Sequence, residues 1–323
     1  MSESMELLDG PVAVSDAEGL RQPPSVSGSM PNVLTIDVED WFHVTNFENH
    51  IRRDDWDRCE TRIQYTMPLL LDLLEEHNTR ATFFVLGWVA ERFPWIVRRI
   101  AEAGHELASH GQDHHLITDI TPENFRRQIW KSRDVVEQVT GELLRGYRAP
   151  SYSLRKSTDW AISVMLEAGF EYDSSVFPFG FRCDPAWRHA CFPYRIYDQG
   201  VDFVTEYPLA TIPCAGHNMP IAGGGYFRLL PYGVIRWAVR EINRKGFPAI
   251  MYLHPWELDP DQPRVHEASW LAKFRHYHQL GNTESKLTQL LRDFRFYSIR
   301  DVFWSRESQR YENVPQFTTV PME

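Results

Sequence analysis

The chain has 323 residues, of which 43% are hydrophobic and 24% are charged, a composition typical of a globular protein with an ample core. Its 34 basic and 44 acidic residues give a net charge of −10, and no strongly basic patch is concentrated in it, so no nucleic-acid partner is expected. It contains no run of about 18 uncharged apolar residues, so no transmembrane helix is expected.

The two ends of the chain are predicted to be tails. The first 30 residues carry several acids and one arginine, and they lack the basic start and apolar centre of a signal peptide. We therefore expect a disordered tail over residues 1–31, one domain over residues 32–305 and a C-terminal tail over residues 306–323. A cytoplasmic location is the matching expectation. The cysteines include no Cys-x-x-Cys pair and are expected to be reduced thiols: Cys59, Cys183, Cys191 and Cys214.

Strands and helices are predicted to alternate along the chain. Apolar, β-branched runs predict strands at residues 32–37, 80–85, 105–108, 144–148, 171–174, 247–253 and 296–299, with short strands near 202–212 in an irregular segment, 178–222. Amphipathic runs predict helices at residues 67–77, 88–103, 121–140, 156–168, 231–245 and 283–293. Thr121-Pro-Glu is a strong helix start, and Pro94 is expected to break the second helix. This alternation favours a parallel α/β sheet or barrel.

Polar residues follow several of the predicted strands. They are the acids after Ile36, and His110, Arg148, Asp173 and His254. In parallel α/β folds the chemistry lies at the carboxyl ends of the strands. We therefore expect these residues to share one site.

His110 and His114 are four residues apart, in Leu107-Ala-Ser-His-Gly-Gln-Asp-His-His115. On a helical turn, or a loop that resembles one, such residues lie on the same face and can bind one metal ion. A third ligand must come from elsewhere. Taken alone, the pair is as compatible with ordinary surface or core histidines.

The segment Asp37-Val-Glu-Asp40 places three acids at the end of the first predicted strand. One of them can complete the metal site, and another can act as general base towards water. Strand alternation puts Asp37 and Glu39 on one face, which favours them for these roles. Because the strand is expected to end here, Asp40 also remains a candidate ligand.

Three further residues have candidate roles. Arg148, in Gly146-Tyr-Arg-Ala-Pro-Ser-Tyr152, can hold the carboxylate of a base in place. Asp173 can orient a histidine, although it also suits a turn at a strand end. His254 follows an apolar strand and precedes a proline, and a histidine fixed in this way suits a general acid.

Two glycine- or histidine-rich segments are not assigned to the site. Gly223-Gly-Gly-Tyr-Phe-Arg228 lacks the Lys-Ser/Thr of a phosphate loop and is expected to let substrate approach the backbone. His266, His276 and His278 are expected to be exposed histidines rather than ligands.

The order of these motifs resembles that of NodB-like polysaccharide deacetylases, which form family 4 of the carbohydrate esterases. The resemblance extends from about Asn32 to Trp256, most of the chain. Within the family, four segments look like the deacetylases of exosortase-associated exopolysaccharide loci, near allantoinase-like and peptidoglycan deacetylases. These segments are Ile36-Asp-Val-Glu-Asp-Trp-Phe42, Ala81-Thr-Phe-Phe-Val-Leu-Gly87, His254-Pro-Trp-Glu257 and Thr283-Glu-Ser-Lys-Leu287.

The resemblance implies a distorted (β/α) barrel and one divalent metal ion, usually zinc. It also implies a role for each matching residue: Asp37 as base, His110 and His114 as ligands, Arg148 holding the base, His254 as acid and Asp173 tuning that acid. The usual first motif has two adjacent aspartates, but Val38 stands at the second position. Relatives with an Asp-x-Asp spacing place the ligand two residues on, which leaves Glu39 and Asp40 both open.

The implied activity is hydrolysis of N-acetyl groups on amino sugars of a polysaccharide or its precursor, in exopolysaccharide biosynthesis. A backbone N–H near Tyr152 is expected to stabilise the oxyanion. The partner is then an N-acetylated saccharide, and peripheral contact with membrane-linked precursors stays open. One alternative is a C–N hydrolase of a small cyclic or linear amide. A non-catalytic sugar-binding protein is less compatible with the motifs, because binding needs no acid–base pair.

Overall fold

The structure is a computed structural model that describes residues 30–179, 190–198, 200, 202–214, 217–304 and 316–318. Most of the two predicted tails, and Cys183, lie outside these residues. Within the described part no helix combines the length and the apolar character needed to cross a membrane. The described cysteines, Cys59, Cys191 and Cys214, form no disulfide, as expected for reduced thiols.

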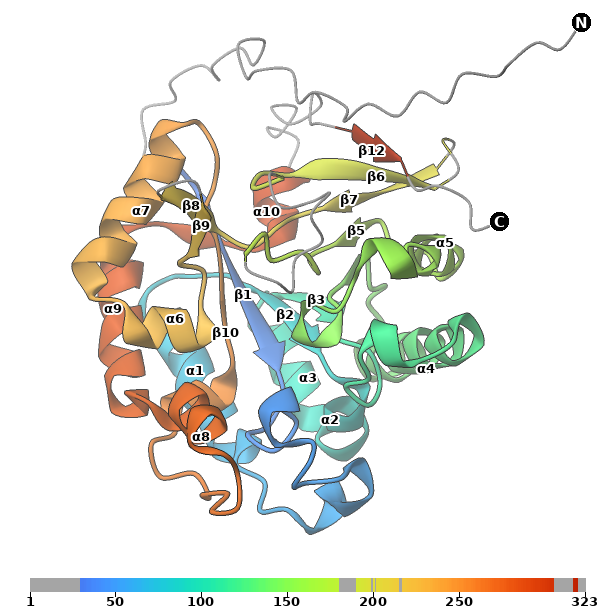
Figure 1. The fold of residues 1–323 in the computed structure, drawn as a ribbon, viewed down its shortest axis with the longest axis horizontal. Coiled ribbons are helices and arrows are strands. Elements are labelled where there is room, and N and C mark those ends of the chain that lie inside the picture. Colours follow the sequence, from blue (N-terminus) through green and yellow to red (C-terminus); the bar gives the residue numbers. More distant parts are fainter. Residues whose placement is uncertain are drawn as a thin grey trace, which may run out of the picture.

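Parallel strands form the centre of the molecule (Figure 1). In the order β10-β1-β2-β3-β4-β5 neighbouring strands are parallel, and β7, β6 and β12 continue the sheet beyond β5. The strands are β1 (Asn32–Val38), β2 (Thr82–Val85), β3 (Glu106–Ser109), β4 (Gly146–Tyr147), β5 (Tyr172–Asp173), β6 (Tyr194–Asp198), β7 (Asp202–Glu206), β10 (Ile250–Leu253) and β12 (Gln316–Thr318). β11 (Phe296–Tyr297) pairs with β1, and β8 (Thr211–Cys214) and β9 (His217–Pro220) form a separate hairpin.

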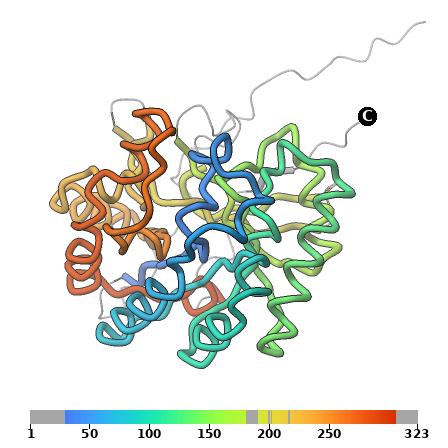
Figure 2. The backbone as a smooth tube through the Cα atoms, turned by 90° about the horizontal axis from the view of Figure 1, so that it is seen from below, coloured from blue at the N-terminus to red at the C-terminus, as the bar shows by residue number. Residues whose placement is uncertain are grey.

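Helices surround this sheet, as Figure 2 shows from below. They are α1 (Ile63–Glu76), α2 (Gly87–Arg92), α3 (Pro94–Glu102), α4 (Pro122–Thr140), α5 (Trp160–Glu167), α6 (Gly224–Leu229), α7 (Tyr232–Arg244), α8 (Trp270–Tyr277), α9 (Thr283–Asp293) and α10 (Ile299–Phe303). Every residue of β1, β2, β3 and β10 is buried, as is usual for the central strands of a parallel sheet that is covered on both faces.

Irregular segments link the two sides of the sheet. The backbone N–H of Ala210 donates to Ile250 in β10, and the N–H of Leu209 donates to Val176 just after β5. The chain around the β8–β9 hairpin thus connects β10 with the segment that follows β5, although no regular ladder runs between them. The expected distorted (β/α) barrel is confirmed.

Most predicted elements lie close to their expected positions, and the differences have local causes. Thr121 caps α4 by accepting from the Asn124 N–H, and Pro94 separates α2 from α3. However, α1 begins at Ile63, so that Pro68 lies inside the helix rather than in its first turn. The residues expected to continue the last strand begin α10 instead, where the side chain of Ser298 caps the helix.

Two predictions for the C-terminal region are wrong. Gly223 approaches another strand rather than leaving room for substrate, because a Cβ there would lie 1.6 Å from the carbonyl oxygen of Tyr252. His276 is not exposed: it is buried, its Nε2 lies 2.7 Å from Oε1 of Gln262, and its ring stacks on Trp256.

Candidate active site

The carboxyl ends of β1, β3, β4 and β10 bring most of the predicted site residues together. Parallel strands end at the same edge of a sheet, and β1 lies between β10 and β2 in the sheet order. Asp37 and Glu39 leave β1, His110 follows β3, Arg148 follows β4 and His254 follows β10. All of these residues except His254 are at most 2% exposed, so that the site is a largely dry environment.

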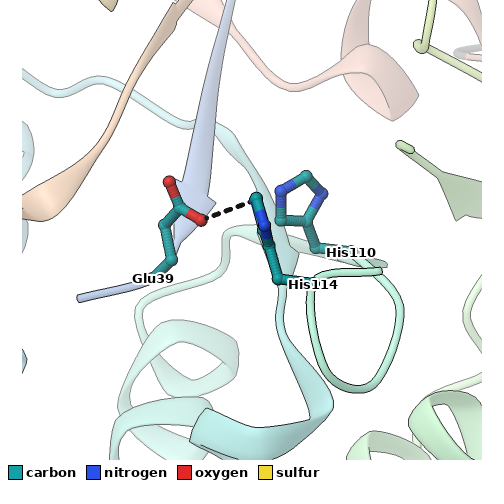
Figure 3. Close-up of side chains that lie close together, drawn as sticks. All are labelled: Glu39, His110 and His114. Atoms are coloured by element: carbon teal, nitrogen blue, oxygen red, sulfur yellow. Dashed lines mark ion pairs between the residues drawn. The ribbon is translucent and has the colours of Figure 1, made fainter. Parts of the chain in front are cut away.

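Glu39, His110 and His114 form a metal-type cluster (Figure 3). One ligand atom from each lies within 4.8 Å of the others, and all three side chains are buried. Oε2 of Glu39 lies 3.1 Å from Nε2 of His114. The sequence left the carboxylate ligand open between Glu39 and Asp40, and this geometry favours Glu39.

The two histidines lie on a loop rather than on a helix. Gly111 has a φ of 76° and His114 a φ of 52°, both in the left-handed region. A non-glycine residue is strained there, and such strain is typical of functional sites. The Arg53 side chain holds the loop by donating to the carbonyls of Asp113 and His114 at 2.8 and 3.0 Å.

The cluster fits a divalent metal ion on three grounds. The hydrogen bond between Nδ1 of His110 and the Arg148 carbonyl, 2.8 Å long, turns Nε2 of His110 towards the cluster, as is usual for metal-binding histidines. Burial lowers the pKa of His110 to about 4, which keeps the imidazole neutral and able to bind. Oε2 of Glu39 is buried, and its neighbour is Nε2 of His114 at 3.1 Å, so that a cation bound by both atoms would satisfy this carboxylate. Nitrogen and oxygen ligands of this kind suit zinc and related ions.

Asp40 points away from the cluster. Its carboxylate accepts the backbone N–H groups of Trp41, Arg62 and Ile63 at 2.8 to 3.1 Å. Arg62 and Ile63 begin α1, so Asp40 caps the amino end of that helix from a distant part of the chain. A carboxylate with both oxygens engaged in this way has a structural reason for its position, and the choice of Asp40 as ligand finds no support.

Asp37 is held by Arg148, as the sequence predicted. Nη1 of Arg148 donates to Oδ1 of Asp37 at 2.6 Å and to the hydroxyl of Thr35, while Nε and Nη2 donate to the carbonyl and hydroxyl of Ser174. Oδ2 of Asp37 faces the hydroxyl of Tyr152 at 3.5 Å and Nε2 of His254 at 3.9 Å. One oxygen of this carboxylate is therefore fixed, and the other faces the site.

His254 lies between two carboxylates. Its Nδ1 is 2.8 Å from Oε1 of Glu257, and its Nε2 is 3.3 Å from Oε1 of Glu39. Burial on its own would lower the pKa of His254, but the hydrogen bond to Glu257 and the negative charges of Glu39, Glu257 and Asp37 raise it to about 9. A protonated histidine that faces the site through Nε2 can deliver a proton there.

Asp173 does not contact His254 as the sequence led us to expect. It lies opposite Glu206 in the register of β5 and β7, and its carboxyl bonds to Glu206 and to the hydroxyl of Ser175. Burial and the charge of Asp173 raise the pKa of Glu206 well above its ordinary value. The two carboxyls therefore lie side by side within the sheet, and the partner of His254 is Glu257.

An oxyanion donor was expected among the backbone N–H groups near Tyr152, and the N–H of Tyr152 itself is engaged elsewhere. The backbone N–H of Tyr152 donates to the carbonyl of Ala149 at 3.0 Å, within the tight turn η5 (Pro150–Tyr152). Both Ser151 and Tyr152 have positive φ values, 51° and 55°. This conformation directs the Tyr152 side chain towards Asp37, so the side chain rather than the N–H of Tyr152 reaches the site.

A cleft of about 320 Å³ adjoins His114, and its size is typical of small-ligand pockets. Its walls come from the segment after β1 and combine aromatic with charged side chains, among them His43, Trp56, Arg52 and Asp54. Burial keeps the pKa of His43 well below its ordinary value. The cleft gives an outside molecule a place beside the cluster.

Sequence reasoning missed three residues of the site: Arg53, Arg228 and Glu257. Nothing in the local pattern marks Arg53 or Arg228. Glu257 did carry a signal, because a glutamate three residues after a helix-capping position can reach back to the capping N–H. The N–H of His254 donates to Oε1 of Glu257 in this way, 3.1 Å away.

Comparisons with known proteins agree with this geometry. Residues 54–172 match the polysaccharide deacetylase family, and residues 174–304 match a family described as a domain of unknown function. The chain is 37% identical over 95 residues to a peptidoglycan-N-acetylglucosamine deacetylase of Bacillus cereus, which covers 29% of this chain and 34% of that protein. It is 36% identical over 77 residues to a chitooligosaccharide deacetylase of Rhizobium leguminosarum, which covers 24% of this chain and 34% of that protein.

A third relative, a peptidoglycan deacetylase of Helicobacter pylori, is 29% identical over 126 residues, covering 38% of this chain and 42% of its own length. The matched segment thus spans well under half of each of these curated relatives. One solved structure extends over nearly the whole chain. It comes from Mycobacterium smegmatis, is provisionally named a polysaccharide deacetylase, and has a TM-score of 0.59 at 20% identity over 94% of this chain and 99% of that one. At this identity the likeness shows the fold.

Proposed function

Because the chain contains a domain of the polysaccharide deacetylase family over residues 54–172, we propose that it is a metal-dependent hydrolase of N-acetyl groups on amino sugars. The substrate is a polysaccharide or its precursor. The relatives act, by their names, on peptidoglycan N-acetylglucosamine and on chitooligosaccharides, and all of these carry N-acetylated amino sugars.

The observation that carries the proposal is the position of Glu39. One of its oxygens lies 3.1 Å from His114 and the other lies 3.3 Å from His254. The metal-type cluster and the candidate acid are therefore adjacent, and Asp37 faces the same point through Oδ2. A binding protein would have no use for a buried carboxylate and an oppositely placed imidazole at the same point.

Each side chain has a definite task in amide hydrolysis. Glu39, His110 and His114 would hold the metal, which polarises the acetyl carbonyl and makes water easier to deprotonate when it is bound. Asp37 takes a proton from water as the water oxygen attacks the carbonyl carbon. His254 gives a proton from Nε2 to the nitrogen as the C–N bond breaks, because an amine anion is too basic to leave. The products are acetate and a free amino sugar.

Three finer points belong to the proposal. Zinc is the metal we favour, since two histidines and one carboxylate are typical zinc ligands. An exopolysaccharide precursor is favoured by the resemblance of His254-Pro-Trp-Glu257 and its companion motifs to deacetylases of exopolysaccharide loci. The cytoplasmic location and the contact with membrane-linked precursors stay predictions.

The test is acetate release from N-acetylglucosamine oligomers by the zinc-loaded protein. We expect release by the wild type and none by His110→Ala, with the zinc content of each protein measured in parallel. His115→Ala is the matched control, because this neighbouring histidine is not part of the metal-type cluster and its variant should retain both zinc and activity.

Two results would contradict the proposal. Undiminished acetate release by His110→Ala would show that the cluster is not the catalytic centre. A wild type that binds one equivalent of zinc but releases no acetate would remove amino sugars as substrates. Small cyclic and linear amides would then be assayed, and turnover of these would establish the alternative C–N hydrolase.

A further inference from the structure

Glu257 is a buried carboxylate to which the proposed reaction assigns no task. It lies in the short helix η8 (Pro255–Leu258), which turns the chain back on itself directly after His254. Oε1 of Glu257 accepts from the backbone N–H of His254 at 3.1 Å and lies 2.8 Å from Nδ1 of His254. Oε2 accepts from Nε of Arg228 at 2.9 Å. Both oxygens are thus engaged, and the side chain is fully buried.

Arg228 is itself held firmly. It is 1% exposed, and its Nη1 and Nη2 groups donate to the carbonyls of Arg275, His276 and His278 at 2.6 to 3.0 Å. These carbonyls lie at the carboxyl end of α8, where unpaired carbonyls favour a cation. Figure 1 shows α6, which carries Arg228, and α8 beside the end of β10.

Burial of two opposite charges stabilises a site only when the geometry is good and the remaining donors and acceptors are satisfied. Both conditions hold here. Burial would raise the pKa of Glu257, but the hydrogen bond from His254 and the charge of Arg228 lower it below the ordinary value. An ionised carboxylate accepts only, so the proton on this side of the imidazole must lie on Nδ1.

Resting on the proposed function, we propose that Glu257 is the positioning residue of His254, and that Arg228 fixes Glu257 in turn. The Nδ1–H of His254 donates to Glu257 throughout the reaction. In the step that breaks the C–N bond, the Nε2 proton moves to the departing nitrogen, and His254 becomes neutral while it keeps Nδ1–H. Water supplies the hydroxyl of acetate, and its other proton goes to Asp37.

This assignment also gives a task to the segment described only as a domain of unknown function. Arg228, His254 and Glu257 all lie within residues 174–304. Asp173, which was predicted to orient the acid, lies just outside that segment and neighbours Glu206 instead. Residues 174–304 therefore contribute the proposed acid and the residues that hold it. The part of the chain before them contributes the proposed base and the metal-type cluster.

The experiment compares two acetyl substrates in Glu257→Gln. An amino sugar needs a proton to leave, whereas the phenolate of an aryl acetate such as 4-nitrophenyl acetate leaves without one. We expect kcat for the N-acetylglucosamine oligomer to fall about 10- to 100-fold, as is typical when the partner of a working histidine is lost. Turnover of the aryl acetate should change less than about threefold. His254→Ala should show the same selectivity with a larger loss.

A second readout needs no activity. In zinc-free protein labelled with ¹⁵N-histidine, the slowly exchanging Nδ1–H signal that disappears in His254→Ala should also be lost or shifted in Glu257→Gln. Exposed Glu267→Gln is the matched control and should alter neither readout. If wild type lacks deacetylation altogether, the proposed function fails, but the NMR signal still tests the role of Glu257.

Three results would overturn the proposal: equal losses on both substrates in Glu257→Gln, unchanged deacetylation, or an unchanged His254 signal. Asp173→Asn provides the opposite test. A selective loss of deacetylation in Asp173→Asn, with Glu257→Gln unaffected, would return the positioning role to Asp173.

Discussion

Residues 32–173 contain the proposed base and the metal-type cluster, whereas residues 174–304 contain the proposed acid, and each segment pairs a buried arginine with a buried carboxylate. Arg148 donates to Asp37 at 2.6 Å in the first, and Arg228 donates to Glu257 at 2.9 Å in the second. The difference lies in what the carboxylate does next. Asp37 keeps one oxygen facing the site, while both oxygens of Glu257 are engaged.

The comparison shows how one type of ion pair can serve two purposes. A base must present its own carboxylate to the reaction, so its arginine can hold only one oxygen. A histidine that acts as an acid must present a proton instead. The carboxylate that orients this histidine does so best when both of its own oxygens are hydrogen-bonded. The two pairs also differ in setting, because Asp37 and Arg148 come from strand ends, whereas Glu257 and Arg228 come from η8 and α6.

The largest effect is expected for Asp37→Asn. Without the base, turnover of both the amino sugar and the aryl acetate should fall by about 10²- to 10⁴-fold, since water must be deprotonated for either substrate. Zinc content should stay unchanged, because Asp37 is outside the metal-type cluster. Parallel kinetics on both substrates check this. A selective loss on the amide alone would make Asp37 part of the acid side and would break the division between the two segments.

The two arginines provide a matched pair of intermediate effect. Arg148→Lys and Arg228→Lys keep the charge but lose most of the forked hydrogen bonds, so each should lower the free energy of unfolding by about 2–4 kcal/mol. Only Arg148→Lys should slow the aryl acetate reaction. Urea unfolding and two-substrate kinetics test both statements. Arg244→Lys, at an exposed position, is the control, and its free energy of unfolding should change by less than about 0.5 kcal/mol. A drop in aryl acetate turnover in Arg228→Lys would argue against separate tasks for the two arginines.

The same division explains which features the sequence could predict. Strands, helices and the polar residues at strand ends follow from local patterns, and Asp37, Glu39, His110, Arg148 and His254 do lie at one end of the sheet. In the second segment the important contacts depend on packing. Arg228 reaches the carboxyl end of α8 about fifty residues away in sequence, and no periodicity predicts such a contact.

Similar residues at similar places can also have different tasks. Asp173 is the last residue of its strand and Asp37 the last but one of its own, but the neighbour of Asp173 across the sheet is Glu206, which only the strand order β5-β7 reveals. Asp40 stands beside Glu39, but its oxygens are taken by the start of α1. In both cases the residue type and the position near a strand end suit a role in the site. The groups that the fold places beside each carboxylate give it a structural role instead.

The smallest effect concerns the boundary between the two segments, where Asp173 and Glu206 meet. The pKa of Glu206 is raised in the folded protein by burial and by the charge of Asp173. The contribution of Glu206 to the free energy of unfolding is therefore most favourable below its ordinary pKa of 4.5, and this contribution is lost as the pH rises through the raised pKa of the folded protein. Glu206→Gln mimics the protonated form and removes this loss. As the pH rises from below 4.5 towards the raised pKa of Glu206, the free energy of unfolding of the wild type should therefore fall relative to the variant. Unfolding by urea across this range measures it, and the ratio of amide to aryl acetate turnover should stay constant. If that ratio changed as it does in Glu257→Gln, the buried pair would belong to the acid side of the site rather than to the sheet that supports it.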